Sequence, residues 1–230
     1  MSEYLQILHE DNHLLIVNKP PGVLVQGDAT GDEPLVEIGK AYIGKKYKKP
    51  GEVFLGVVHR LDRPVSGVVV FARTSKALKR MNALFRNKET IKTYWAIVRE
   101  LPPQEEDTLI HWLVKDEAKN KTTAYRRETP GALRAELRYR VMARSGGMIF
   151  LEVNPLTGRP HQIRVQLASI GCPIRGDLKY GDTSPLEDSS IALHARQLEF
   201  MHPVRQEKLI VQAELPRNRV WDAFIGSSES

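Results

Sequence analysis

The stretch from Gly67 to Val98 reads GVVVFARTSKALKRMNALFRNKETIKTYWAIV and changes hydrophobic period twice. Its first segment, Gly67–Ala72, is a short apolar run of the length expected for a buried strand. Thr74 or Ser75 can then cap a helix. That helix is indicated by apolar residues at helical spacing, namely Leu78, Met81 and Phe85. Residues Ile91–Val98 alternate as a strand does, so the stretch predicts strand, helix and strand in that order.

Most of the remaining chain predicts strands. Leu14–Val17 is apolar and ends at the turn residues Pro20-Pro21-Gly22. Further strands are expected at residues 122–126, 135–143, 148–153, 192–200 and 209–215. A second helix is expected from Pro160, a favourable first helical residue, to Gly171, a favourable C-terminal cap. Strands that follow strands, with two strong helices, predict an α+β fold on a mixed, mainly antiparallel sheet with flanking helices.

Length and composition indicate one cytoplasmic domain. The 230 residues suit a single domain over residues 1–230, with a frayed tail at 226–230. The lone cysteine, Cys172, excludes an internal disulfide and favours a reducing compartment. The first residues contain acids and histidines where a secretory signal would carry a basic stretch and an apolar run, and we expect no membrane span.

The charge is unevenly distributed. The chain has 34 Lys and Arg against 28 Asp and Glu, for a formal net charge of +6. Residues 73–92 hold seven basic residues and one acid, and a second lysine run at 40–49 is interleaved with two tyrosines. Residues 100–117 are rich in acids. The pattern predicts one basic and one acidic face and favours a polyanionic partner, either nucleic acid or an anionic membrane. For Lys45–Lys49 alone, a solvated loop is an equally good interpretation.

Common catalytic and metal-binding motifs do not occur in the sequence. It contains no GxxxxGK[ST], GxGxxG, HExxH or GxSxG segment, and its seven histidines lack ligand spacing, so we expect no metal and no cofactor. What remains is Asp62, flanked by Arg60 and Arg63, whose positive charges would keep the carboxylate ionised. Such a carboxylate can act as a nucleophile or a base. Taken by itself, the segment is also explained by a surface ion pair.

Two further positions suit contact with an anion or a nucleic-acid base. His161 and Arg164 lie three residues apart on one face of the second predicted helix, near its N-terminus, which suits a carboxylate or phosphate. Tyr94 shares a strand face with Lys92 and could stack on a base. A solvated helix face and ordinary packing, respectively, explain these residues when each is taken alone.

Five segments, in chain order, resemble the motifs of the RluA family of RNA pseudouridine synthases over roughly residues 14–203. They are NKPPGV from Asn18, VHRLDR from Val58 with Ser66-Gly67, KTY from Lys92, LTGRPHQIRV from Leu156, and LHA from Leu193. The resemblance implies a pseudouridine synthase fold with a central RNA-binding cleft. It also implies a monomer that isomerises a specific uridine of tRNA or rRNA to pseudouridine, with base flipping and without a cofactor or metal.

The resemblance also implies roles for individual residues. Asp62 matches the catalytic aspartate, and Arg164 matches the arginine that pairs with it. Tyr94 matches the tyrosine that stacks on the target base and removes a proton late in the reaction. The remaining matches are Arg60, which fills the space left by the extruded nucleotide, Lys19, at the rim of the pocket, and Leu193, an apolar contact under the tyrosine. From their charge, we expect His161, Lys76, Lys79 and Arg80 to contact RNA, the last three from the solvent side of their helix.

Departures from the family pattern leave the RNA substrate open. Pro64 and Val65 stand where Asp and Thr are frequent, and Gln166 and Ser169 stand where histidines are common. Because NKPPG begins at residue 18, we expect no S4 domain before it. Two other functions remain as alternatives. One is an RNA-binding module or chaperone on the same fold, and the other is a carboxylate hydrolase, which would need a second carboxylate near Asp62.

Overall fold

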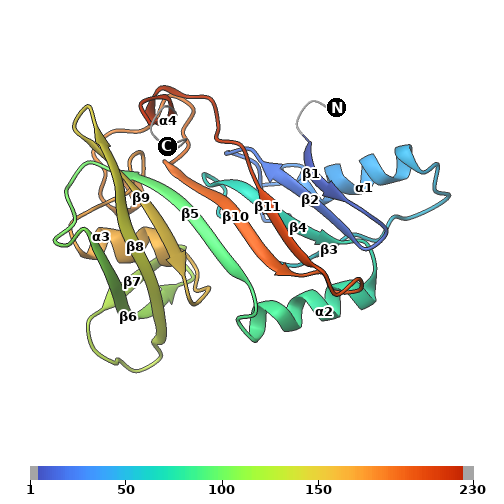
Figure 1. Ribbon diagram of the computed structural model, residues 1–230, viewed down its shortest axis with the longest axis horizontal. Coiled ribbons are helices and arrows are strands. Elements are labelled where there is room, and N and C mark those ends of the chain that lie inside the picture. The colour runs from blue at the N-terminus through green and yellow to red at the C-terminus, as the bar shows by residue number, and fades with distance from the viewer. Residues whose placement is uncertain (1–4, 225–230) are drawn as a thin grey trace. The chain divides into compact units, whose positions relative to one another are not determined.

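The computed structural model describes residues 5–224 (Figure 1), so the tail expected at 226–230 lies outside the described residues. The chain, for which we expect a single domain, divides into two compact units. The first comprises the residues up to Lys92 together with Ala195–Leu215, and the second comprises Thr93–His194 together with the residues from Pro216. Within residues 5–224, every helix is too short or too polar to cross a membrane.

The first unit is built on a sheet with a helix on each face. Its strands run in the order β1 (Gln6–Glu10), β2 (Leu14–Lys19), β4 (Ser66–Ala72) and β10 (Leu193–Met201), while β3 (Gly56–Val57) pairs with β4 and β11 (Lys208–Gln212) pairs with β10. The β1–β2, β2–β4, β3–β4 and β10–β11 ladders are antiparallel, as predicted. Ile16 and Val70 on one face pack with Met81 of α2 (Ser75–Arg86). Helix α1 (Leu35–Lys46) packs on the opposite face, which carries Leu15.

Helix α2 forms where the sequence predicts it. Thr74 is the N-cap, and its hydroxyl accepts a hydrogen bond from the N–H of Ala77 at 3.1 Å. Ala77 and Met81 are buried, whereas Lys76, Lys79 and Arg80 are exposed. The three basic side chains therefore lie on the solvent side of α2, as expected.

Helix α1 was not predicted, because its sequence has two helix-weakening glycines and no regular apolar spacing. Packing explains one of them. A Cβ on Gly39 would lie 2.7 Å from the Leu55 side chain, so a larger residue here would require that side chain to move. The lysine run is partly structural too, because Tyr42, Lys46 and Tyr47 all bind the carboxylate of Glu10, at 2.6–2.8 Å. This second run is therefore only in part a solvated loop.

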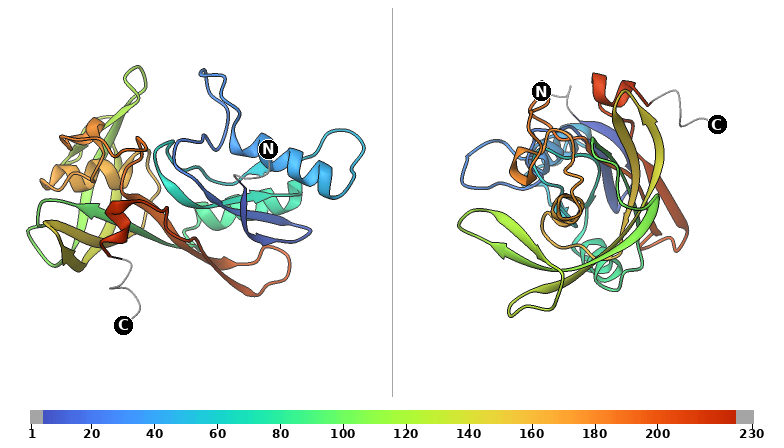
Figure 2. Two further views of the ribbon diagram at one scale, coloured as in Figure 1. Left: turned by 90° about the horizontal axis from the view of Figure 1, so that it is seen from above. Right: turned by 90° about the vertical axis from the view of Figure 1, so that its left-hand side faces the viewer.

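The second unit is a five-stranded antiparallel sheet. Its order is β5 (Ile91–Val98), β9 (Met148–Pro155), β8 (Leu133–Ser145), β6 (Glu106–Asp116) and β7 (Lys121–Tyr125). Helix α3 (Gln162–Ser169) packs against β6 and β7 through Val165 (Figure 2), and the short elements η1 (Leu178–Tyr180) and α4 (Arg219–Asp222) follow it. The α+β architecture agrees with the prediction from sequence.

Strand β6 lies in the acidic segment, for which the sequence predicts an acidic face. Glu106 lies directly opposite Arg140 of β8, and Glu105, just before β6, forms an ion pair with Arg144. Arg140 also contacts Glu152 of β9 at 3.2 Å. Two acids of this segment, Glu105 and Glu106, therefore lie beside arginines of β8. Asp116 and Glu117 pair instead with lysines close to them in the chain. The acidic composition hid the alternation of buried residues, Leu109, His111 and Leu113.

Helix α3 begins two residues later than predicted. His161, its N-cap, adopts a left-handed φ of 54°, so the helix starts at Gln162. The Gln162 side-chain oxygen accepts hydrogen bonds from the N–H of Arg159 and the hydroxyl of Thr157, at 2.9 and 2.8 Å, which fixes the preceding turn. The end at Gly171 is as predicted. Its φ is 83°, and the N–H groups of residues 171 and 172 bond back into the last turn as in a Schellman motif.

Candidate active site

Residues 58–65, here called the aspartate loop, connect β3 to β4 in the first unit. Asp62 is half-buried on this loop, and its carbonyl accepts a hydrogen bond from the N–H of Val65 at 3.0 Å. Arg60 is exposed. Arg63 is also exposed, and its guanidinium donates to the carbonyl of Gly22 and forms an ion pair with Asp32 at 2.7 Å. The loop thus presents a carboxylate beside two arginines, one of which joins it to the NKPPG turn.

Lys19 joins the aspartate loop to the end of β2 from inside the protein. Its Nζ donates to the carbonyls of Pro20, Arg63 and Val65 at 2.9, 3.1 and 2.7 Å. Burial lowers the pKa of Lys19 to about 7, an effect that the negative charge of Asp62 opposes. The resemblance implies a lysine at the rim of a pocket. In the structure this side chain is instead completely buried, and its ammonium donates hydrogen bonds to three backbone carbonyls of the loops beside Asp62.

His59 fixes the start of the aspartate loop. Its Nε2 accepts a hydrogen bond from the N–H of Val70 at 3.2 Å, and its ring stacks on Phe85 of α2 with 4.9 Å between centroids. Burial and the nearby charge of Lys92 lower the pKa of His59 to about 4, so the ring is neutral at physiological pH. His59 therefore holds the loop through packing and one hydrogen bond, without a charge.

The strand β4 that follows the aspartate loop begins with Ser66 and Gly67. Gly67 has a φ of 117°, and a Cβ there would lie 2.3–2.8 Å from the backbone of Ala195 on β10. Only glycine permits this approach of two backbones. The glycine of the Ser-Gly motif is therefore required by the packing of β4 against β10, directly after the aspartate loop.

Arg164 lies in the second unit, on α3, and is bound by a carboxylate that sequence reasoning missed. Its Nε and Nη2 donate to the two carboxylate oxygens of Asp177 at 2.7 and 2.8 Å. The two side chains are only 6% and 1% exposed. The helix face that carries Arg164 is therefore enclosed, where a solvated face was the simpler expectation. A bidentate pair of this kind restricts the guanidinium in both position and plane.

Tyr180 of η1 completes the surroundings of Arg164. The Arg164 guanidinium carbon lies 5.0 Å from the centroid of the Tyr180 ring. The Tyr180 hydroxyl accepts a hydrogen bond from the N–H of Thr122 at 2.8 Å and lies 2.7 Å from Nδ1 of His161. The Tyr180 hydroxyl therefore connects β7, through Thr122, to His161 at the start of α3. In the sequence, Asp177 and Tyr180 are marked only by the glycines beside them, Gly176 and Gly181.

Tyr94 and Leu193 also belong to the second unit. Tyr94 is half-buried on β5 and lies opposite Val153 of β9. Leu193, the first residue of β10, is 3% exposed. Lys92, on the same strand face as Tyr94, has a pKa lowered by burial and by the charge of Lys88. Of these two motif positions, Tyr94 thus lies inside a strand and Leu193 at the start of one.

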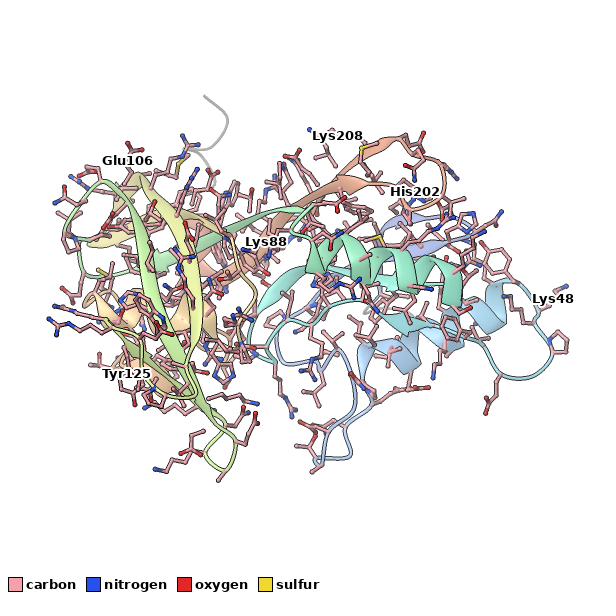
Figure 3. The ribbon with its side chains drawn as sticks, turned by 90° about the horizontal axis from the view of Figure 1, so that it is seen from below. Lys48, Lys88, Glu106, Tyr125, His202 and Lys208 are labelled. Carbon is pink, nitrogen blue, oxygen red and sulfur yellow. The ribbon has the colours of Figure 1, made fainter. Side chains whose placement is uncertain are left out.

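Three side chains of the first unit gather where a metal could bind. Ligand atoms of His9, Asp11 and His202 lie within 4.8 Å of one another, and His202 lies in the turn after β10 (Figure 3). However, Nδ1 of His202 accepts hydrogen bonds from the N–H groups of Val204 and Arg205. The ring proton is therefore on Nε2, which lies 2.9 Å from the Asp11 carboxylate. A metal ligand needs a lone pair at that atom, so this cluster does not fit a metal ion.

Comparison with known proteins places the chain in a family. The family model described as RNA pseudouridylate synthase matches residues 13–169, which include the aspartate loop and Arg164. The chain belongs to the RNA pseudouridylate synthase family. Its motifs and its curated relatives are those of the RluA type.

Two relatives from Vibrio cholerae cover nearly all of this family member. Ribosomal large subunit pseudouridine synthase C is 33% identical over 221 residues, covering 91% of this chain but only 65% of the relative. tRNA pseudouridine synthase C is 32% identical over 242 residues, covering 96% of this chain and 94% of the relative. Among solved structures, Human RNA Pseudouridylate Synthase Domain Containing 4 matches with a TM-score of 0.76 and 29% identity, covering 92% of this chain and 89% of that one. The fold expectation is thereby confirmed.

Proposed function

We propose that this chain converts a specific uridine of tRNA or rRNA to pseudouridine in the cytoplasm. Family membership supports the reaction, and the named relatives support the class of substrate, because one is named for transfer RNA and one for the large ribosomal subunit. The observation that carries the proposal is the placement of Asp62. This carboxylate is half-buried on a loop whose backbone is held by Lys19 and His59. A fixed, partly enclosed carboxylate suits nucleophilic catalysis.

The reaction balances without a cofactor. The Asp62 carboxylate attacks the bound uridine, and the bond between the ribose carbon C1′ and N1 of uracil breaks. The uracil then turns, a bond forms between C1′ and C5, and the proton on C5 is removed while N1 gains one. Asp62 leaves in its original form, whether it attacks the sugar or the base, so the enzyme is ready for another turnover.

The uridine must leave the RNA stack before it can react, at a cost of a few kcal/mol. Arg60 is exposed on the aspartate loop and fills the space that the uridine leaves. Tyr94 stacks on the flipped uracil and later accepts the C5 proton, and Leu193 supports the tyrosine from its buried side. These contacts offset part of the cost of extrusion.

Arg164 keeps the nucleophile ionised. A guanidinium has five N–H donors, and the bidentate pair with Asp177 uses two of them. The others can serve a second anion while the pair fixes the plane of the group. His161, whose Nδ1 lies 2.7 Å from the Tyr180 hydroxyl, adds a second polar side chain of the same unit for contact with the RNA.

The exposed basic side chains of α2 hold RNA phosphates. Replacing Lys76, Lys79 and Arg80 with Gln should weaken binding to unrelated RNAs and flatten the dependence of log Kd on log salt by roughly two units. Saturated turnover should change far less, because these side chains do not reach the uracil. Arg80 also donates to the carbonyl of Pro203 at 2.7 Å, so a Lys76→Gln, Lys79→Gln variant separates RNA binding from this structural bond.

The decisive experiment maps pseudouridine across total RNA from cells with and without this protein. One or a few positions should lose the modification, and purified wild-type protein should restore it on unmodified transcripts. Asp62→Asn should abolish the restoration, a loss of at least about 10³-fold in rate, with RNA affinity within about twofold. An Asn variant that still turns over would contradict the role of Asp62. An unchanged map, together with inactive wild-type protein, would contradict the function.

A further inference from the structure

A cavity lies within the second unit, between α3, β7 and η1. Its volume is about 510 Å³, enough for one nucleotide. The floor is apolar and is formed by Ala124, Val165 and Ala168. The rim is polar and carries Lys121, Thr123, Ser169 and Lys179. A cavity with an apolar floor and a polar rim suits a ligand that is amphipathic, such as a sugar or base joined to a phosphate.

The charged side chains around the cavity favour binding of an anion. Among the described residues that line it there are two lysines and no carboxylate. Lys179 donates to the carbonyl of Asn120 at 3.0 Å, and an ammonium has two further donors. Asp116 lies opposite Lys121 in the β6–β7 ladder, but it forms an ion pair with Lys119 at 3.7 Å. The two rim ammonium groups therefore attract a negatively charged group.

Tyr180 forms a wall of this cavity and connects it to Arg164. Lys121 Nζ lies 5.8 Å from the centroid of the Tyr180 ring, and the Arg164 guanidinium carbon lies 5.0 Å from it. The ring is 8% exposed and is covered too well to stack on a base. It separates the two cations and holds His161 through its hydroxyl. A ligand in the cavity would thus lie beside residues that we assign to the reaction.

We propose that this cavity binds one nucleotide of the RNA strand outside the target uridine. Its phosphate lies on Lys121 and Lys179, its sugar lies on the apolar floor, and the hydroxyl of Thr123 meets the ribose 2′-OH. The inference rests on the proposed function, since it takes RNA as the substrate. It adds a subsite that fixes the position of the RNA strand on the second unit, because a phosphate held there sets which nucleotide lies beside Arg164 and His161.

The test removes the two rim charges and compares a matched control. In the subsite variant, Lys121→Gln and Lys179→Gln are combined. In the control, Lys115→Gln and Arg127→Gln remove the same charge from β6 and from the segment after β7, without touching the lining or the Asp116–Lys119 pair. For the subsite variant we expect KM to rise about tenfold, kcat to stay within about twofold, and the salt slope of binding to fall by about one unit, the value for one phosphate. The control should keep wild-type values.

A single neutral linkage in the RNA identifies the phosphate. Methylphosphonate placed at each linkage near the target uridine should raise the wild-type KM most at one position, and that position should lose its effect in the subsite variant. Equal effects of the subsite and control variants, or no effect of either, would overturn the proposal. So would a linkage effect that persists in the subsite variant. These outcomes differ from failure of the proposed function, in which the wild type itself modifies no RNA.

Discussion

The aspartate loop of the first unit and helix α3 of the second both present a charged side chain, and they hold it by different means. Asp62 belongs to a loop whose backbone is fixed by the ammonium of Lys19 and the neutral ring of His59. Arg164 is fixed through its own guanidinium, by the buried carboxylate of Asp177. In the aspartate loop it is the backbone on either side of Asp62 that is held in place. In α3 it is the side chain, and the bidentate pair sets the direction of the Arg164 guanidinium.

The largest expected effect comes from breaking the partner of Arg164. Asp177→Asn should lower the free energy of unfolding by about 3–5 kcal/mol, because it breaks the bidentate ion pair of a buried guanidinium. Urea denaturation at pH 7 measures the loss. The double variant Arg164→Met, Asp177→Leu should recover most of that stability while its pseudouridine formation stays lost. A double variant as unstable as the single one would show that the ion pair itself does not determine the stability of this region.

A smaller effect should follow acidification of the aspartate loop. The pKa of His59 is lowered to about 4, so between pH 6.5 and pH 4 the unfolded chain binds a proton that the folded chain does not. Stability should therefore fall with pH in this window, by up to about 3 kcal/mol. Urea denaturation of wild type and His59→Gln at pH 7 and pH 4.5 checks this, since only the wild type carries this contribution. Parallel losses in both proteins would refute the role of His59.

The smallest effect should appear at alkaline pH and concerns Lys19. Its folded pKa, about 7, lies below the usual value of 10.5, so between these values the unfolded chain binds more protons. Stability from this group should rise with pH, by about 1.4 kcal/mol per unit at most. The difference in unfolding free energy between wild type and Lys19→Met, measured at pH 8 and pH 9, should grow in favour of the wild type. A constant difference would mean that Lys19 keeps an ordinary pKa.

Most strands and helix α2 could be predicted because their signal is local. Apolar runs and helical spacing mark β2, β4 and α2, and Gly171 marks the end of α3. Helix α1 could not, since it has no regular apolar spacing and packs through Gly39 against Leu15 and Leu55, which are distant in the sequence. Strand β6 was not predicted, because the acidic composition of this segment was taken to indicate an exposed surface and its alternating buried residues were overlooked.

The candidate site divides in the same way. Asp62, Tyr94 and Arg164 stand out in the sequence through their motifs, whereas the residues that hold them do not. Asp177 and Tyr180 follow Arg164 by 13 and 16 positions and carry no periodic signal. A lysine at the end of a strand, such as Lys19, normally predicts exposure. Only the fold shows that three carbonyls surround its ammonium.

The enclosed pair of Arg164 and Asp177 also limits how this protein can diverge. Because loss of either residue would break a buried bidentate ion pair, a descendant sequence that loses one is expected to be selected against before the other can change. Variation at the two positions should therefore be coupled. Paralogues that abandon catalysis should replace both by apolar residues, so the identity of this pair offers a way to separate active from inactive members in genome sequences.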